Sequence, residues 1–263
     1  MSRVATVKFT DYRSSIAKAL DLVGAGDQLP QQGLIIIKPN LTNSSPPPVT
    51  TSVEAAEAVY DYCKTRTKAE IAIGDGCGSG VTADVFAGLG YTALSEKCGI
   101  RLIDFNDGET ILLKDRNALQ LKQFHMPTVV RGAFVISLPV LKDHSFTGTT
   151  IAMKNMFGIA PGKFYSGGWN KAKLHSPSTD KSVVDICRYK KPDLSVVDAS
   201  VALSGMHLSG TPNKLGLILA SFDPVAVDTV GSKLMGHDPK KLPYLTLSNN
   251  LHGQMENVEI VTG

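Results

Sequence analysis

Short apolar runs alternate along this chain with longer segments in which apolar residues recur every three or four positions. The short runs are rich in β-branched residues and predict strands, and the longer segments predict amphipathic helices. The expected strands are Val4–Phe9, Leu34–Lys38, Glu70–Ile73, Arg101–Asp104, Ala133–Leu138, Leu194–Asp198 and Leu215–Ala220. The expected helices are Tyr12–Val23, Ser52–Thr65, Asp84–Cys98, Lys181–Lys190 and Pro224–Met235, and Thr110–Gln123 predicts a small additional β segment.

This alternation is typical of an α/β fold with a mostly parallel sheet and helices on both faces. The 263 residues suffice for a single domain over 1–263, or for two α/β lobes with a cleft between them. If there are two lobes, we expect them to be 1–130 and 131–263. The boundary would then lie near Pro127–Gly132, where the first series of strands and helices ends.

The composition narrows the classes of partner. A net charge of +3, without a basic run interleaved with aromatic residues, predicts no nucleic-acid partner. No window is apolar enough for a signal peptide or a membrane span, so we expect a cytoplasmic protein with no membrane partner. The four cysteines form no C-x-x-C pair, which argues against a zinc knuckle or a bacterial-ferredoxin cluster. The oligomeric state is not determined by these features.

Polar groups follow the second expected strand. Lys38 ends that strand and Asn40 follows it, ahead of a proline-rich loop and the helix that opens at Ser52. Open α/β sheets bind ligands at the carboxyl ends of their strands, so both side chains are candidate ligand-binding groups. The structural alternative for Lys38 is a lysine that extends its ammonium from the core to solvent.

A glycine-rich loop follows the third expected strand. Asp75 is followed by Gly76, Gly78 and Gly80, and a helical segment comes next. Backbone N–H groups in such a loop suit a phosphate or carboxylate. The loop matches neither a Walker A motif nor the G-x-G-x-x-G dinucleotide fingerprint. Asp75 is therefore a candidate base, orienting group or metal ligand, and a simple structural turn is the alternative.

The strongest concentration of donors lies between residues 142 and 175. Five lysines and two histidines stand there against one acid, Asp143. Lys142 and His144 are two residues apart, so in an extended segment both point to one side. Lys154 and Asn155 follow in a helix-like stretch, and His175 comes after the loop 161–169. The basic residues in this stretch are Lys142, His144, Lys154, Lys163, Lys171, Lys173 and His175.

The two histidines are the candidates for proton transfer. We expect like-charge repulsion from the lysines to lower the pKa values of His144 and His175, which favours the neutral imidazole. Asp228 lies in the apolar stretch of the last long helix, where it is a candidate to orient a histidine or to pair with a lysine. Asp223, followed by Pro224, is expected to cap that helix instead.

These segments together resemble the family catalogued as domain of unknown function 362. The matching stretches are IIIKPNL, IGDGCGSG, LIDFND, SLPVLKDHSFTGTTIAMKNMFG, His175, LSVVDA and FDPVAVDTVGSKLMG. Some members of the family carry an additional ferredoxin-like segment with clustered cysteines, which this chain lacks. A shorter stretch, Lys154–Gly162 with His175, is similar to the catalytic lysine-to-histidine region of lactate-racemase-like proteins. In those proteins a modified nicotinamide and nickel lie between two α/β domains.

We interpret the sequence as a protein that binds a small anionic ligand, a carboxylate or a phosphate, in a cleft lined by lysines and histidines. An isomerase-type or proton-abstracting enzyme fits such a site, since ammonium groups stabilise an enolate and paired histidines exchange protons with it. One alternative is a non-catalytic binding or cofactor-handling protein, and a second is a metal-dependent hydrolase. The sequence identifies neither a cofactor nor a metal.

Overall fold

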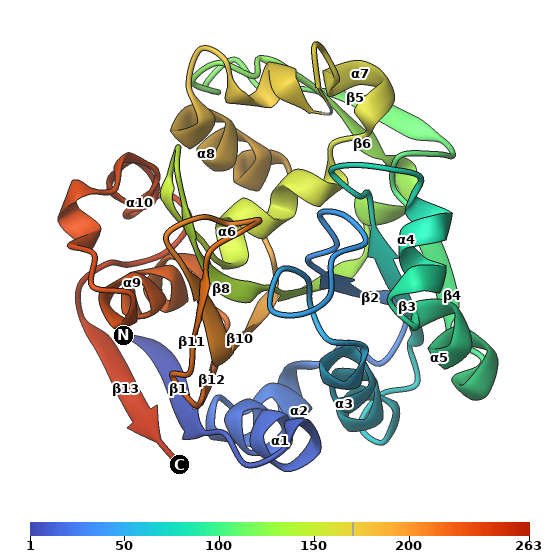
Figure 1. Ribbon diagram of the computed structural model, residues 1–263, viewed down its shortest axis with the longest axis vertical. Helices are drawn as coiled ribbons and strands as arrows, with labels where there is room; N and C mark the ends of the chain where they lie inside the picture. The colour runs from blue at the N-terminus through green and yellow to red at the C-terminus, as the bar shows by residue number, and fades with distance from the viewer. Residues whose placement is uncertain (170) are drawn as a thin grey trace.

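A large mixed sheet with helices on both faces forms the molecule (Figure 1). The structure is a computed structural model and describes residues 1–169 and 171–263. The strand order along the main path is β13-β1-β12-β10-β7-β2-β3-β4. On this path only β12 (Leu217–Ser221) runs against its neighbours, and the other adjacent pairs are parallel. The predicted α/β class with a mostly parallel sheet is confirmed.

The sheet is buried on both faces, as its β-branched sequence predicts. In β2 (Leu34–Pro39), Ile35 and Ile37 belong to one hydrophobic core, whereas Ile36 belongs to another on the opposite face. The remaining strands of the main path are β1 (Ser2–Lys8), β3 (Glu70–Asp75), β4 (Arg101–Asp104), β7 (Phe134–Leu138), β10 (Leu194–Ser204) and β13 (Val258–Thr262).

Helices from the two halves of the chain cover opposite faces of the sheet. The first face packs against α1 (Tyr12–Leu22), α2 (Ala25–Gln28), α3 (Val53–Lys64), α4 (Thr82–Gly88) and α5 (Tyr91–Cys98). The second packs against α6 (Ala152–Asn155), α8 (Thr179–Tyr189), α9 (Pro224–Leu234) and α10 (Pro243–Ser248). Asp223 accepts hydrogen bonds from the N–H groups of Val225 and Ala226 at the start of α9, so its predicted capping role is confirmed.

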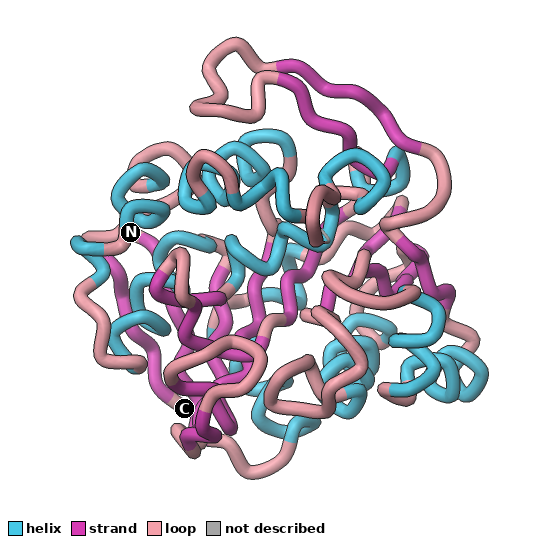
Figure 2. Tube along the Cα trace, turned by 45° about the horizontal axis from the view of Figure 1, so that its top comes forward, coloured by secondary structure: helices cyan, strands magenta, loops and turns pink. Residues whose placement is uncertain are grey.

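Several local expectations need correction. The segment Asp84–Cys98 forms two helices, α4 and α5, because Gly90 between them has a φ of +85° and ends the helical path. The predicted β segment Thr110–Gln123 is the first part of a hairpin of β5 (Thr110–Lys114) and β6 (Gln123–Pro127). Figure 2 shows this hairpin as a separate arm along one edge of the molecule.

Short strands extend the sheet beyond β7. The chain turns at Pro139 into β8 (Val140–His144), which pairs with β10 and forms a hairpin with β9 (Gly148–Thr150). A further short strand, β11 (Thr211–Asn213), pairs with the end of β10. Because β7 pairs with both β2 and β10, one hydrogen-bonded sheet crosses the proposed boundary at Pro127–Gly132. The division into lobes 1–130 and 131–263 stays a prediction.

Over residues 1–169 and 171–263, no helix combines the length and the apolar character that crossing a membrane requires. The cytoplasmic location stays a prediction.

Candidate functional site

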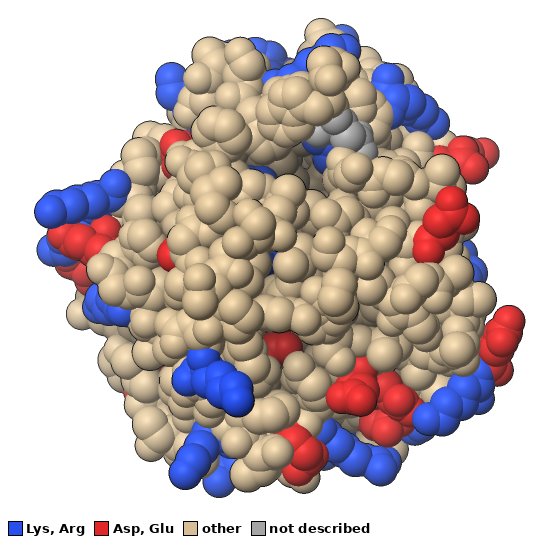
Figure 3. All heavy atoms as spheres, viewed as in Figure 1, with Lys and Arg blue, Asp and Glu red and all other residues tan. Residues whose placement is uncertain are grey.

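A cavity of about 340 Å³ lies at the carboxyl ends of β2 and β3 and is closed by β8, β9, α6 and the neighbouring loops. On the face viewed in Figure 3, charged side chains lie mainly around the edge, and traces of lysine or arginine are visible within central hollows. The cavity walls include ten of the residues expected from the sequence: Lys38, Asn40, Asp75, Gly76, Gly78, Lys142, His144, Lys154, Asn155 and His175. This is the edge of the sheet at which ligands are expected in open α/β folds.

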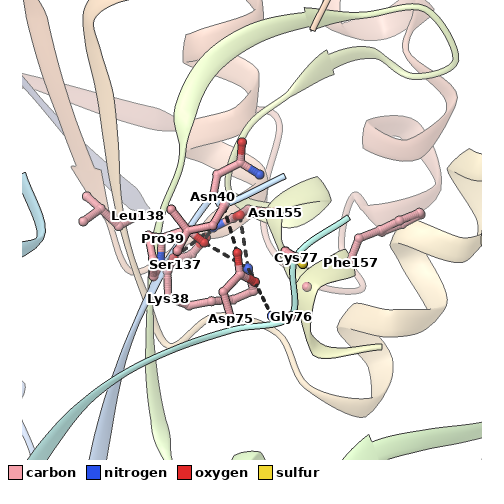
Figure 4. Close-up of polar contacts among 12 residues, drawn as sticks. Lys38, Pro39, Asn40, Asp75, Gly76, Cys77, Ser137, Leu138, Asn155 and Phe157 are labelled. Carbon is pink, nitrogen blue, oxygen red and sulfur yellow. Dashed lines mark hydrogen bonds and ion pairs between the residues drawn. The ribbon is translucent and has the colours of Figure 1, made fainter. Parts of the chain in front are cut away.

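Lys38 and Asp75, which both line this cavity, form a buried ion pair (Figure 4). The Lys38 Nζ lies 2.7 Å from the Asp75 Oδ1, and the side chain of Lys38 is fully buried. Asp75 also accepts hydrogen bonds from the N–H groups of Leu41 (2.8 Å) and Gly76 (2.9 Å). Burial lowers the pKa of Lys38, and the attraction of Asp75 opposes that shift. The Asp75 carboxylate is thus fully engaged as the counter-charge and anchor of neighbouring segments.

Asn155 holds this ion pair in place. Its Oδ1 accepts a hydrogen bond from the Lys38 Nζ at 3.2 Å, and its Nδ2 donates to the Lys38 carbonyl and to the Ser137 Oγ, both at 3.0 Å. The amide therefore ties α6 to the ends of β2 and β7 (Figure 4). All the polar atoms of the Asn155 side chain are engaged inside the protein, so Asn155 acts as a positioning residue for Lys38.

Lys142 and Lys171 are buried cations that are held by oxygen atoms other than carboxylates. The Lys142 Nζ donates to the Asn40 Oδ1 at 2.6 Å and to the Val49 carbonyl at 2.8 Å. The Lys171 Nζ donates to the carbonyls of Gly76, Phe157 and Gly158, at 2.6, 3.2 and 3.4 Å. Burial lowers the pKa of Lys142 to about 7 and that of Lys171 to about 8.

Lys154 differs from the other three lysines of the cavity. Its ammonium lies 3.6 Å from the centre of the Phe157 ring and makes neither a hydrogen bond nor an ion pair with any residue of the described chain. The side chain is only 8% exposed. Burial lowers the pKa of Lys154 to about 7, and repulsion from Lys142, Lys171 and Lys38 contributes to the shift. Three of the four cavity lysines thus lack a carboxylate partner among the described residues.

The histidines present complementary nitrogen atoms. The Nδ1 of His144 accepts a hydrogen bond from the Phe146 N–H at 3.1 Å, so the neutral ring carries its proton on Nε2. The Nδ1 of His175 donates to the Lys171 carbonyl at 3.1 Å, which leaves its Nε2 as an acceptor. The two ring centres are 6.5 Å apart, and the planes differ by 15°. One neutral ring therefore carries an Nε2–H donor and the other an Nε2 acceptor, and both residues line the same cavity.

Burial is the first cause of the lowered histidine pKa values. It lowers the pKa of His144 to about 2 and that of His175 to about 4, and the Lys154 charge adds to both shifts. The predicted direction is correct, but like-charge repulsion is the smaller cause. A third ring, His207, stacks on His144 with a centroid distance of 4.2 Å and also has a lowered pKa, about 4. All three imidazoles are neutral near pH 7.

Two further polar atoms at the cavity have no partner in the described part of the chain. They are the Oγ1 of Thr150 and the Nδ1 of His207, and both are buried. Buried polar atoms are usually hydrogen-bonded, because leaving one unpaired costs about 1–3 kcal/mol. Together with the Lys154 ammonium, they are three positions at which a bound polar molecule would supply a hydrogen-bond or charge partner.

The glycine loop is positioned by contacts within the protein. Its N–H groups at Gly76, Cys77 and Ser79 donate to Asp75, Thr82 and Thr42, respectively. Gly76 and Gly78 line the cavity, whereas Gly80, which has a φ of +87°, does not. A Cβ on Gly78 would meet the Thr42 carbonyl oxygen at 3.1 Å, so close packing rather than a positive φ restricts this position. The loop therefore shapes the wall with most of its donors already engaged.

Asp228 does not reach the cavity. Its carboxylate accepts hydrogen bonds from the N–H groups of Ala152 (2.8 Å) and Met153 (3.3 Å), and it is fully buried. Burial raises its pKa to about 8. The structure therefore does not bring Asp228 next to a histidine or a lysine of the site. Its contact fixes the start of α6, the helix that carries Lys154 and Asn155.

The sequence interpretation missed two functional groups of the cavity. Lys171 is one basic residue among several in the sequence, and it lines the cavity from a loop position with a φ of +57°. His207 lies in the loop between β10 and β11, where no pattern connects it with His144. In residues 1–169 and 171–263, no three side chains of His, Cys, Asp or Glu form a group that could hold a metal ion.

Comparison with known proteins identifies the relatives of this chain. The family model described as "Domain of unknown function (DUF362)" matches residues 35–233. The chain belongs to this family. It is also similar to a thylakoid-associated protein from Synechocystis sp., with 29% identity over 236 residues, which is 88% of this chain and 71% of that protein. The resemblance seen in the sequence is thereby confirmed, and the matched region contains every cavity residue named above.

Proposed function

We propose that this DUF362 protein binds a small molecule with a carboxylate or phosphate group in the cavity of Lys142, Lys154 and Lys171. The observation that carries the proposal is the charge balance of the buried groups. Four lysines line the cavity, and only Lys38 has a carboxylate partner in the described chain, Asp75. A buried cation without a counter-charge is costly, and a bound anion removes that cost.

The histidines extend this proposal to proton transfer. A carboxylate held by the lysines would lie beside the Nε2–H of His144 and the unprotonated Nε2 of His175. One ring is then able to accept a proton from the carbon next to the carboxylate while the other donates a hydrogen bond to the developing enolate. An isomerase-type or proton-abstracting enzyme is the reaction class that these groups support best.

Anion binding is tested by calorimetric titration of sulfate, malonate and phosphate into the wild-type protein and into Lys142→Met and Lys154→Met. Each substitution is expected to weaken binding by about tenfold to a hundredfold, because it removes one charge-assisted hydrogen bond worth about 1.5–3 kcal/mol. Lys163→Met is the matched control, since Lys163 is exposed and, among the described residues, its ammonium donates only to the Gly108 carbonyl. Equal affinities in all four proteins would refute the proposal.

Proton abstraction is tested separately. Small carboxylates that bind are incubated with the protein in deuterium oxide, and exchange of the hydrogen next to the carboxylate is followed by NMR. We expect exchange in the wild-type protein and its loss in His175→Gln, with binding retained. Binding without exchange for every carboxylate tested would favour the non-catalytic binding or cofactor-handling protein.

A further inference from the structure

We propose that the Lys154 amine forms an imine with the carbonyl carbon of a ligand that also carries a carboxylate, such as a 2-oxo acid. This inference rests on the proposed anion binding and names the class of ligand more closely. It starts from the contrast between Lys154 and the three other lysines of the cavity.

Hydrogen bonds hold the nitrogens of Lys38, Lys142 and Lys171 in place. Lys38 donates to Asp75, Pro39 and Asn155, and the other two donate to amide or carbonyl oxygens. Lys154 has only the face of the Phe157 ring at 3.6 Å among its described neighbours. No acceptor in the described part of the chain therefore fixes its N–H groups, and its lone pair is available when the amine is neutral.

The neutral amine is accessible at Lys154 near pH 7. The side chain is buried and faces the like charges of Lys142, Lys171 and Lys38, which together lower its pKa to about 7. About half of the amine is then neutral at pH 7, whereas an exposed lysine is neutral to less than about one part in a thousand. A desolvated lysine near other cations is the usual form of a nucleophilic amine.

The neighbouring groups match the other parts of such a ligand. The Lys142 ammonium, which donates to two oxygens of the described chain, has a third N–H for its carboxylate, and the nearby charge of Lys171 adds to the attraction. The Oγ1 of Thr150, which has no partner among the described residues, offers a hydroxyl in the same wall. The protonated imine is itself a cation, so it keeps the favourable contact with the Phe157 ring.

The bond changes balance with the groups present. The Lys154 lone pair attacks the carbonyl carbon, and the π electrons of the C=O bond move to the oxygen, which accepts a hydrogen bond from the Nε2–H of His144. His175 Nε2 takes a proton from the attacking nitrogen and returns it to that oxygen. The hydroxyl group then leaves as water with one proton from solvent, and a protonated C=N bond remains. No oxidant or reductant is needed.

The experiment uses pyruvate as the probe and sodium cyanoborohydride to reduce the imine to a stable secondary amine at pH 7. The modified lysine is identified by peptide mass spectrometry. We expect modification of Lys154 at least about a hundredfold faster than that of exposed lysines, from their neutral fractions. Sulfate should suppress the reaction by competition. Lys154→Arg should abolish it, and Lys163→Arg, which changes an exposed lysine, should not.

The outcomes separate this inference from the proposed function. If pyruvate and sulfate compete for the cavity in calorimetry but Lys154 is not modified, the imine is refuted and anion binding stands. If neither anion binds and no lysine is selectively modified, both proposals fail. Should Lys154→Arg not fold, as judged by its melting temperature, selective modification of wild-type Lys154 and its suppression by sulfate still decide the question. Equal modification of all lysines refutes the imine.

Discussion

When an anion binds in the cavity, the protein should take up protons, because the lysines there are partly neutral before the anion binds. Burial lowers the pKa values of Lys142 and Lys154 to about 7 and that of Lys171 to about 8. A bound anion stabilises the charged form of each lysine and returns its pKa toward the ordinary value. Protons must therefore bind together with the anion.

The number of protons follows from these pKa values. At pH 8 a group with a pKa of about 7 is about nine-tenths neutral and one with a pKa of about 8 is half neutral, so restoring all three charges takes up about two protons. At pH 6 the three lysines are already charged, and the uptake falls below about 0.3 protons. The affinity should accordingly fall by at least about tenfold between pH 7 and pH 8. The lowered pKa values keep the histidines neutral throughout.

Calorimetry in several buffers measures this uptake directly. Sulfate is the probe, since its own charge is constant over this range, and the dependence of the binding enthalpy on the ionisation enthalpy of the buffer gives the proton number. Lys154→Met should lower the uptake at pH 8 by about one proton, and Lys163→Met should leave it unchanged. Measurable sulfate binding at pH 8 with an uptake below about half a proton would refute the reasoning. The lysines would then be charged in the free protein or would not contact the anion.

Three further predictions concern stability. Asp75→Asn should lower the free energy of unfolding by about 3–5 kcal/mol in urea denaturation, because Lys38 loses its buried counter-charge. Adding Lys38→Met to this variant should recover part of the loss. A loss below about 1 kcal/mol would contradict the role given to the ion pair. Gly158→Ala should lower the melting temperature, because its Cβ would overlap the Asp75 carboxylate and the Lys38 ammonium, whereas Gly132→Ala, with no atom within 4 Å of its Cβ, should not. Finally, the stability of Lys142→Met relative to the wild type should decline from pH 7 to pH 10. The pKa of Lys142 is lower in the folded than in the unfolded protein, so the free energy of unfolding of the wild type rises by up to about 1.4 kcal/mol per pH unit over this range. If the difference in stability between the wild type and Lys142→Met does not change with pH, the pKa of Lys142 is not lowered.

The positions of Lys38, Asp75, Lys142 and His144 could be predicted because they follow from local rules. Each stands in or at the end of a strand, and the carboxyl ends of parallel strands meet at one edge of the sheet. The two-residue period of β8 also turns Lys142 and His144 to the same side. A strand pattern in the sequence is therefore enough to bring such groups together.

The partners of these groups could not be predicted, because they come from distant segments. Asp75 faces Lys38 only after β2 and β3 pair. The carbonyls that hold Lys171 belong to the loop after β3 and to the 3-10 helix Met156–Ile159. The same holds for Asp228. Helical periodicity predicts that this acid faces the protein interior, but its hydrogen bonds to the start of α6 follow only from the tertiary structure. Roles that depend on partners require the tertiary structure.

The partners also determine which lysine ammonium a bound ligand would stabilise most. An ion pair, hydrogen bonds to oxygens and contact with an aromatic ring are three ways of stabilising a buried ammonium, and the ring contact contributes the least at about 0.5–2 kcal/mol. Lys38 has the first kind of partner, Lys142 and Lys171 have the second, and Lys154 has only the third among the described residues. Lys154 thus gains most from an incoming anion, or from a carbonyl group that converts its amine into an imine. Substitutions at Lys154 should consequently disturb ligand chemistry with little loss of stability, whereas substitutions at Lys38 should do the reverse.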